Sequence, residues 1–152
     1  MPGTTSAATP CTSVRFVDTN ILIYAISTAP EESEKAARAN ELLAGHDLAV
    51  SVQVLQEFYV QATREGRPGR LRHEAAAGLV ESFQRFPVAP LTVDLLREAM
   101  VTRERFGISY WDAAILEAAR SLGCNTVLSE DLSDGQDYGG VRVENPFQGG
   151  EG

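Results

Sequence analysis

The sequence predicts an α/β fold in which helices cover both faces of a parallel sheet. Short apolar runs of three or four residues alternate along the chain with helical patterns, most of them about 12 residues long. This alternation is typical of βαβ units, because two parallel strands must be joined by a crossover connection. The strand-like runs are mostly apolar, as expected for a sheet buried between two helical layers. At 152 residues, the chain has the length of one domain.

The first half of the chain is expected to form two strands and three helices. In chain order these are a strand at 14–17, helices at 21–26 and 31–43, a strand at 48–50 and a helix at 52–64. Gly45 stops the second helix, because glycine is common just past a helix end. Ser51 is a residue type that caps helix N-termini, so it starts the third helix.

The second half continues the alternation. A loop at 66–69 precedes a helix at 71–86, a strand candidate at 88–91, helices at 93–106 and 110–122, a strand at 126–128, an acidic turn at 129–135 and a last strand at 141–143. Thr92 and Ser109 are expected to cap the two helices that follow them. Gly107 and Gly123 are expected to end those helices.

Composition indicates the class of protein and its surroundings. We expect one domain over 14–147, with disordered tails at 1–13 and 148–152, where residues are small and polar or rich in glycine. No apolar window is long enough to cross a membrane, and no secretory signal precedes the first strand. The two cysteines, Cys11 and Cys124, cannot form a disulfide scaffold. We therefore expect a cytoplasmic protein with no membrane partner.

The net charge of −8, from 21 acidic and 13 basic residues, argues against a general nucleic-acid binder. Net charge does not report clustering, however. Acidic side chains gathered in one pocket can bind divalent cations while arginines elsewhere contact phosphates. The positions of the acidic residues therefore decide which class of function the sequence supports.

Asp112 is a carboxylate on the apolar face of its predicted helix. Apolar residues surround it on the helical wheel, and the charged residues Glu117 and Arg120 lie on the opposite side. Because burying an unpaired charge is costly, its position needs an explanation. In one interpretation Asp112 forms a capping box with Ser109. In the other, it is a metal ligand in a cleft.

Two further acidic positions follow predicted strands. Asp18 ends the first strand, and Glu130-Asp131 follow the strand at 126–128. Local structure alone can explain each, since Asp18 is a suitable helix N-cap and residues 131–135 have turn composition. The carboxyl ends of parallel strands, however, meet at one edge of a sheet, where α/β proteins bind their ligands.

Glu57 is the weakest candidate on pattern alone. It lies off the apolar stripe of its predicted helix, together with Gln53 and Gln61, which is the usual position of a solvated residue. The chain has no zinc-ligand spacing, glycine-rich phosphate loop or serine-nucleophile motif, and His46 and His73 are isolated. Acidic residues without other reactive side chains favour metal-assisted hydrolysis of a phosphodiester.

Four segments of the chain form a recognisable set: Phe16–Tyr24 (FVDTNILIY), Glu57 in a mid-chain helix, Ser109–Ile115 (SYWDAAI) and Leu128–Leu132 (LSEDL). Together they closely resemble a PIN domain and, more narrowly, a VapC-type toxin ribonuclease of a VapBC toxin–antitoxin pair. Each segment alone is weakly specific, whereas all of them in this order in a chain of this length are specific. The resemblance covers 14–147, and the extension before it departs from the family.

The resemblance implies a three-layer α/β/α sandwich with a central parallel sheet and an endoribonuclease that depends on one or two Mg²⁺ or Mn²⁺ ions. By motif position, the catalytic and metal-binding acids would be Asp18, Glu57, Asp112 and Asp131. Supporting residues would be Thr19, Asn20, Ser109 and Glu130. The fourth acid stays open, since Glu130 or Asp134 could take the place of Asp131. An RNA substrate, a cognate VapB-type antitoxin and a homodimer are implied in the same way.

RNA must still approach an acidic pocket. Four arginines in nine residues could contact its phosphates, although a solvated loop is the simpler interpretation: Arg64, Arg67, Arg70 and Arg72. Four aromatic residues could stack on bases, although they fall in apolar helical stretches that are typical of a core: Tyr24, Tyr59, Tyr110 and Trp111.

Three other functions compete with this one. A receiver-type signalling domain needs a lysine near the end of a late strand, and the only lysine is Lys35, in an early helix. A haloacid-dehalogenase-like phosphatase needs a second aspartate two residues after the first, where this chain has Asn20. A catalytically silent PIN-fold binding module would be expected to lose site acids, and all four candidates are present here.

Overall fold

Strand β1 (Arg15–Val17) lies at the centre of a six-stranded sheet in the computed structural model of residues 14–148. The strand order is β3-β2-β1-β4-β6-β5, and every neighbouring pair is parallel except β5–β6. The remaining strands are β2 (Leu48–Ser51), β3 (Val88–Ala89), β4 (Thr126–Leu128), β5 (Asp137–Tyr138) and β6 (Val141–Glu144). The predicted parallel sheet is thus confirmed, with one antiparallel strand added at its edge.

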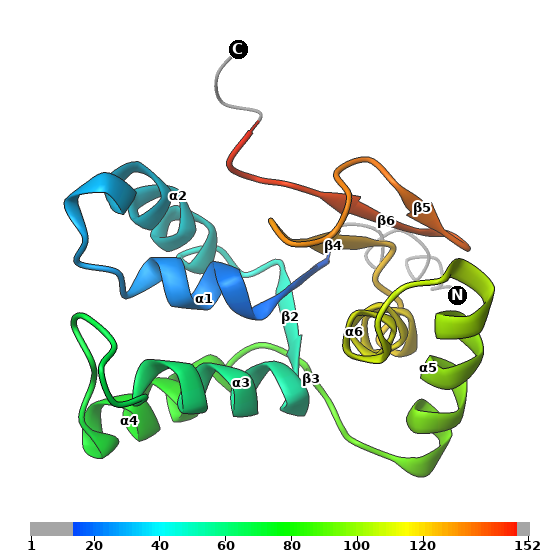
Figure 1. Ribbon diagram of the computed structural model, residues 1–152, viewed down its shortest axis with the longest axis horizontal. Coiled ribbons are helices and arrows are strands. Elements are labelled where there is room, and N and C mark those ends of the chain that lie inside the picture. The colour runs from blue at the N-terminus through cyan, green and yellow to red at the C-terminus, as the bar shows by residue number, and fades with distance from the viewer. Residues whose placement is uncertain (1–13, 149–152) are drawn as a thin grey trace, which may run out of the picture.

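Helices lie on both sides of the sheet (Figure 1), as predicted. One side carries α1 (Thr19–Ala25), the short 3₁₀ helix η3 (Pro30–Glu32), α2 (Ser33–Leu43), α3 (Val52–Ala62) and α4 (His73–Phe83), and the other carries α5 (Val93–Phe106) and α6 (Tyr110–Ser121). Right-handed crossovers explain this division. The chain steps from β1 to β2 to β3 in one direction and then returns across the sheet to β4.

The predicted tails at 1–13 and 148–152 lie outside the described residues, apart from Gln148, and so does Cys11. Cys124 is buried. Among the helices described here, none is long and apolar enough to span a bilayer.

Three of the predicted helix caps are confirmed. The side-chain hydroxyls of Ser51, Thr92 and Ser109 each accept a hydrogen bond from the backbone N–H three residues later, at 3.0–3.1 Å. Gly107 ends α5 in the left-handed conformation (φ 66°), which glycine adopts without the steric cost that a Cβ brings. Ser51 and Ser109 fix the start of α3 and of α6, the two helices that carry Glu57 and Asp112.

Some predicted boundaries differ from the structure for local reasons. Strand β5 was not predicted, because two residues are too few to show a period. Strand β3 stops at Ala89 because the next residue, Pro90, has no N–H to donate. Helix α4 starts later than predicted because the Leu71 N–H is still bonded to the Ala62 carbonyl, at 2.9 Å.

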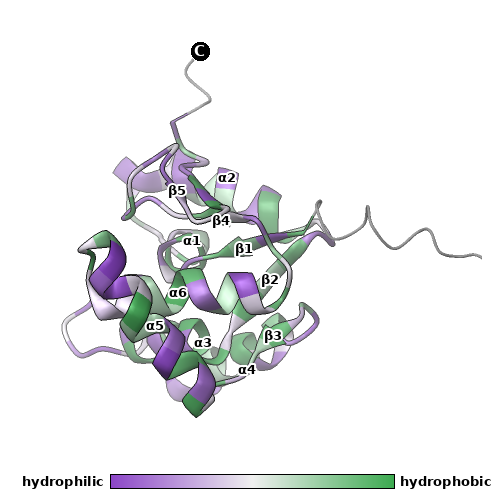
Figure 2. Cartoon of the chain, turned by 90° about the vertical axis from the view of Figure 1, so that its right-hand side faces the viewer, coloured by the Kyte–Doolittle hydropathy of each residue, from purple (hydrophilic) through white to green (hydrophobic). Residues whose placement is uncertain are grey.

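Helix α6 is buried on most of its surface, between the sheet and α5. The side chains from Ala113 to Ala119 are all buried, since α5 packs along the outside of α6. Figure 2 shows α5 nearest the viewer, with hydrophobic and hydrophilic residues interspersed. Glu117, on the side expected to be polar, is only 4% exposed. It accepts hydrogen bonds from Arg120, at 2.9 and 3.1 Å, and from the Thr102 hydroxyl at 2.7 Å.

We expect Arg120→Met to lower the free energy of unfolding by roughly 3 kcal/mol or more, because it leaves the buried Glu117 charge without its partner. Adding Glu117→Leu to this variant should recover much of the loss, since the unpaired charge is then gone. Urea unfolding measures both. The matched control is Arg97→Met, which breaks the exposed pair with Asp94 and should change stability by less than about 0.5 kcal/mol. An equally small effect of Arg120→Met would contradict this account.

Candidate active site

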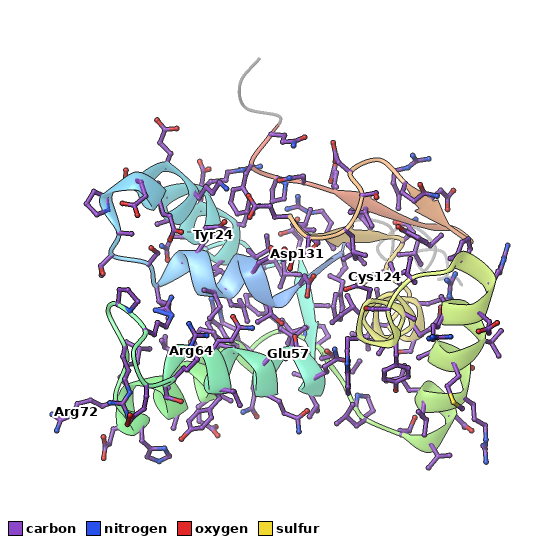
Figure 3. The ribbon with its side chains drawn as sticks, in the orientation of Figure 1. Tyr24, Glu57, Arg64, Arg72, Cys124 and Asp131 are labelled. Carbon is purple, nitrogen blue, oxygen red and sulfur yellow. The ribbon has the colours of Figure 1, made fainter. Side chains whose placement is uncertain are left out.

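Four carboxylates from four separate parts of the chain line one cleft. Asp18 follows β1, Glu57 lies on α3, Asp112 is in the first turn of α6 and Asp131 follows β4. The cleft has a volume of about 280 Å³, and its other lining residues are Thr19, Asn20, Gln53, Gln61, Trp111 and Ile115. Figure 3 shows Glu57 and Asp131 near the N-terminal end of α1. The structure therefore brings together the four acids that the family resemblance implied.

Asp18 is held at the junction of two neighbouring parallel strands. Its backbone N–H donates to the Leu128 carbonyl at 3.0 Å, which continues the pairing of β1 with β4. Its carboxylate accepts one hydrogen bond from the Thr19 backbone N–H and one from the Ser129 hydroxyl, both at 2.8 Å. Asp18 is therefore an N-cap of α1, as one interpretation predicted, and a residue of the cleft at the same time.

The ionisation of Asp18 is perturbed by its surroundings. Its side chain is 6% exposed. Burial raises the pKa of Asp18 from 3.8 to about 6, against the opposing effect of the hydrogen bonds from Ser129 and Thr19. The nearby charges of Asp131 and Glu57 raise this pKa further. Near neutral pH, the metal-free cleft therefore holds a carboxylate that is costly to keep charged.

Glu57 is directed into the cleft by two neighbours. The Thr19 hydroxyl donates to Oε1 of Glu57 at 2.6 Å, and Nε2 of Gln53 donates to Oε2 at 3.1 Å. Residues 53, 57 and 61 follow one another at intervals of four, so they share one face of α3. The sequence predicted that this face of α3 is solvated because it lacks apolar residues. In the structure, this face lines the cleft.

Asp112 makes one of the two hydrogen bonds of the predicted capping box and lines the cleft, while its role as a metal ligand stays a prediction. The Ser109 hydroxyl accepts a hydrogen bond from the Asp112 backbone N–H at 3.0 Å and so caps α6. The Asp112 carboxylate lines the cleft. Burial raises the pKa of Asp112, the Ser109 hydroxyl opposes the increase, and the charges of Asp131 and Glu57 add to it.

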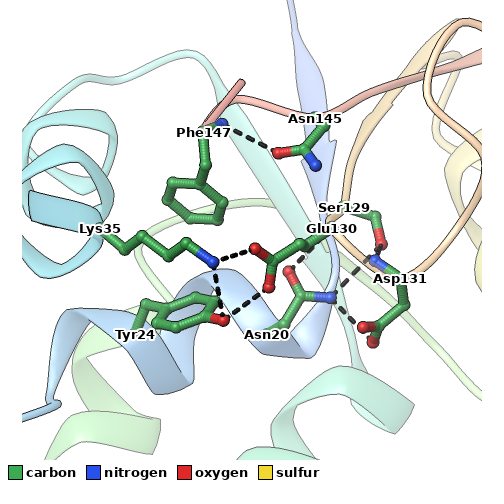
Figure 4. Close-up of polar contacts among 8 residues, drawn as sticks. All are labelled: Asn20, Tyr24, Lys35, Ser129, Glu130, Asp131, Asn145 and Phe147. Carbon is green, nitrogen blue, oxygen red and sulfur yellow. Dashed lines mark hydrogen bonds and ion pairs between the residues drawn. The ribbon is translucent and has the colours of Figure 1, made fainter. Parts of the chain in front are cut away.

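The three candidates for the fourth acid occupy different surroundings. Asp131 lines the cleft, where its Oδ2 accepts a hydrogen bond from Asn20 Nδ2 at 3.0 Å. Glu130 points the other way, accepts a hydrogen bond from the Tyr24 hydroxyl at 2.6 Å and forms an ion pair with Lys35 (Figure 4). Asp134 accepts a hydrogen bond from a backbone N–H after β6, at 2.8 Å. Only Asp131 of these three lies with the other acids.

The pair formed by Lys35 and Glu130 is not part of the acidic cleft. Burial alone would raise the pKa of Glu130, but the Lys35 ammonium and the Tyr24 hydroxyl outweigh it and hold this pKa below its usual value. Lys35 also lies 4.9 Å from the centre of the Tyr24 ring. Glu130 therefore ties the loop after β4 to α1 and α2.

Asn20 anchors the same loop from the cleft side. Its Oδ1 accepts a hydrogen bond from the Glu130 backbone N–H at 3.2 Å, while its Nδ2 donates to Ser129 and Asp131 (Figure 4). The sequence singled out Asn20 but missed Tyr24 and Lys35 as loop anchors. The only signal was the spacing of four residues from Asn20 to Tyr24, which places both on one face of α1.

The donor set of the cleft fits a hard divalent cation. It presents carboxylate, hydroxyl and amide oxygens, and none of the described residues that line it is basic. Within residues 14–148, however, no three His, Cys, Asp or Glu side chains stand close enough to hold a metal ion as they lie. Binding an ion therefore requires side-chain movement, for which the exposed Asp131 is the best placed.

The predicted arginine cluster lies outside the cleft. Arg64 follows the C-terminal end of α3, and Arg72 lies at the far end of the loop before α4 (Figure 3). The Arg70 guanidinium donates to the Thr63 carbonyl at 2.8 Å, so part of the cluster stabilises its own loop. Arg64 comes seven residues after Glu57 and two residues after the last residue of α3, Ala62, so it lies outside the helix.

Comparison with known proteins identifies the family of the chain. A family model described as PIN domain matches residues 15–133. Among curated proteins, no match to the sequence is found. The resemblance stated from the sequence motifs is therefore confirmed at the level of the family model.

Solved structures with the same fold come from toxin–antitoxin proteins. A chain of a toxin–antitoxin complex from Klebsiella pneumoniae has a TM-score of 0.62 and 19% identity, covering 87% of this chain and 97% of that one. VapC20 of Mycobacterium tuberculosis, described as a sarcin–ricin loop cleaving toxin, has a TM-score of 0.61 and 22% identity, covering 77% and 91%. A chain of DNA-bound VapBC from Salmonella typhimurium has a TM-score of 0.62 and 22% identity, covering 88% and 98%. At these identities the likeness shows the fold.

The pKa of Asp18 makes the stability of the metal-free protein depend on pH. A pKa that is raised in the folded state stabilises the protein below the unfolded pKa, 3.8, and this contribution is lost as pH rises through about 6. Asp18 alone should lower the free energy of unfolding by about 3 kcal/mol between about pH 4 and about pH 7. Urea unfolding in a chelator, compared with Asp18→Asn, isolates this slope.

The control for this experiment is Asp94→Asn, an exposed carboxylate of α5 outside the cleft, which should keep the wild-type slope. The same slope in Asp18→Asn and wild type would show that Asp18 ionises without strain.

Proposed function

We propose, since the chain belongs to the PIN domain family, that it is a divalent-metal-dependent endoribonuclease and the toxin of a toxin–antitoxin pair. One observation carries this function: four carboxylates from distant parts of the chain line a single cleft in which no described lining residue is basic. Such a cleft attracts a divalent cation, and the cation then allows an RNA phosphate to approach.

The proposed site assigns a task to each of the residues around the cleft. Asp18, Glu57, Asp112 and Asp131 would hold Mg²⁺ or Mn²⁺ through their carboxylate oxygens. The chemistry that the ion supplies is acidification of water and neutralisation of charge on the phosphate. Thr19, Gln53, Ser129 and Asn20 orient these acids through the hydrogen bonds described above. One of these four acids, at a moment when it is not bound to the ion, would accept the proton of the attacking water.

The alternative functions have less support. A receiver domain would need a free lysine at the cleft, whereas Lys35 is paired with Glu130. The aspartate that a haloacid-dehalogenase-like enzyme needs two residues after the first is replaced by Asn20, which anchors a loop instead. A silent binding module would not need four acids in one cleft, two of which have raised pKa values.

A protein antitoxin is the proposed partner, by analogy with the toxin–antitoxin complexes that share this fold. It would inhibit by covering or occupying the cleft. The proposed substrate, cellular RNA, puts the protein in the cytoplasm.

A homodimer is proposed from the outer face of α5. Exposed apolar side chains gather there and in the segment that leads into the helix: Leu91, Val93, Leu96, Met100 and Val101. The charges of α5 are mixed, with Asp94, Arg97 and Glu98 in its N-terminal half and Arg103, Glu104 and Arg105 in its C-terminal half. Two copies of α5 packed antiparallel would bury the apolar residues and place the half with a net negative charge against the half with a net positive charge.

The arginine cluster is the proposed path for RNA away from the cleft. Glu57 and Gln61 share one face of α3, and Arg64 follows directly after the end of this helix, so the face leads from the acids toward the arginines. The loop lies close to the α1–α2 connection: a Cβ added to Gly69 would lie only 2.9 Å from the Thr28 hydroxyl oxygen. Phosphates beyond the cleft would meet Arg64, Arg67, Arg70 and Arg72 there.

We expect the purified protein to cleave single-stranded RNA with Mn²⁺ or Mg²⁺ and to be inactive in a chelator. Asp112→Asn should lower the rate by roughly 100-fold or more, because it removes one carboxylate of the proposed ion site. Asp134→Asn is the matched control, since this acid caps a loop outside the cleft, and it should keep wild-type activity. Full activity of Asp112→Asn, with a circular dichroism spectrum like that of wild type, would contradict the proposed site.

The proposed dimer has its own test. We expect Met100→Glu to convert a dimer into a monomer at micromolar concentration, because it places a charge in the centre of the apolar face. Light scattering measures the mass, and Arg97→Met, on the same helix, should leave it dimeric. A wild-type mass of one chain throughout would remove this proposal.

A further inference from the structure

Trp111 is the only tryptophan of the chain, and the fold leaves it in solvent at the edge of the acidic cleft. Its side chain is 63% exposed, and it lines the cleft next in sequence to Asp112. A tryptophan is a large apolar residue that folding usually buries, at least in part. In the same helix, the seven residues from Ala113 to Ala119 are all buried. Exposure of Trp111 therefore comes from its position on the cleft side of α6.

The residues around Trp111 hold it in a defined place. Its backbone carbonyl accepts a hydrogen bond from Gln53 Nε2 at 3.4 Å, and the same nitrogen donates to Glu57. The Tyr110 and Trp111 rings are 5.0 Å apart at an angle of 83°. In this edge-to-face arrangement Tyr110 covers at most one face of the indole. A flat apolar surface is thus left open beside four carboxylates.

We infer that the indole of Trp111 is a stacking surface for a nucleobase next to the scissile phosphate. This role rests on the proposed ribonuclease function. An RNA strand has a phosphate for the ion site and flat bases on either side of it, and aromatic rings bind any base through its π-face. Apart from Ile115, the other lining residues are polar, including Thr19, Asn20 and Gln61, which suits a nucleic acid better than an apolar protein face.

A single tryptophan gives a direct readout. The probe is a 12-nucleotide RNA of random sequence, added in Mg²⁺ to the Asp112→Asn protein, which keeps Trp111 and is expected to bind RNA without cleaving it. Stacking should quench and shift the tryptophan fluorescence as RNA binds. An abasic strand of the same length keeps the phosphates but lacks the bases, so it should bind more weakly and leave the fluorescence unchanged.

Variants test the same surface from the protein side. In the Asp112→Asn background, Trp111→Ala should weaken RNA binding roughly 5- to 100-fold, as measured by the anisotropy of labelled RNA. Trp111→Phe should restore most of the affinity because it keeps an aromatic ring. The matched control is Val60→Ala, since Val60 is also 63% exposed but does not line the cleft, and its binding should stay at the level of the background protein.

Three outcomes would overturn the stacking role. If wild type cleaves RNA and the Asp112→Asn protein binds it without any change in fluorescence, the ribonuclease function stands and the role of Trp111 fails. If no RNA is bound or cleaved, the proposed function and the role of Trp111 fail together. If fluorescence changes with protein concentration and not with RNA, Trp111 belongs to a contact between copies of the chain.

Discussion

The structure depends on holding like charges together without a counter-charge. Asp18, Glu57, Asp112 and Asp131 line one cleft, where burial raises the pKa values of both Asp18 and Asp112 and the charges of Glu57 and Asp131 add to the increase. The acids stay in place because separate elements carry them and neighbours bond them. Thr19 contacts two of them, through its backbone N–H to Asp18 and its hydroxyl to Glu57. Under the proposed function, a bound cation would relieve this repulsion.

The parallel sheet makes this convergence possible. Val17 of β1 pairs with Leu128 of β4, so the residues that follow them, Asp18 and Ser129, emerge side by side and share a hydrogen bond. The chain then turns away, and Glu130 is drawn toward Lys35 on α2 while Asp131 stays at the cleft. Adjacent residues of one loop thus have opposite tasks: one fixes the loop to the helical layer, and the other faces the proposed ion.

The sequence predicted the parts of the site that follow from short-range rules. Asp18 was found because it ends an apolar strand, and the Ser109 cap because α6 starts directly after it. Glu57 was not distinguishable from a surface residue, since its face of α3 is polar in either case. Glu130 and Asp131 could not be separated either, because the partner that removes Glu130 from the cleft, Lys35, lies 95 residues away. Strand β5 was missed because two residues carry no pattern.

The central claim is that the four acids form one cation site, and Mn²⁺ binding measured by electron paramagnetic resonance tests it most directly. A titration counts free Mn²⁺ without requiring RNA, an antitoxin or catalysis. We expect wild type to bind Mn²⁺ and Asp18→Asn to bind it at least about tenfold more weakly, because one of the shared carboxylates is gone. Asp94→Asn, outside the cleft, should bind like wild type. Equal affinities of wild type and Asp18→Asn would contradict the claim that Asp18 and its neighbours hold the ion.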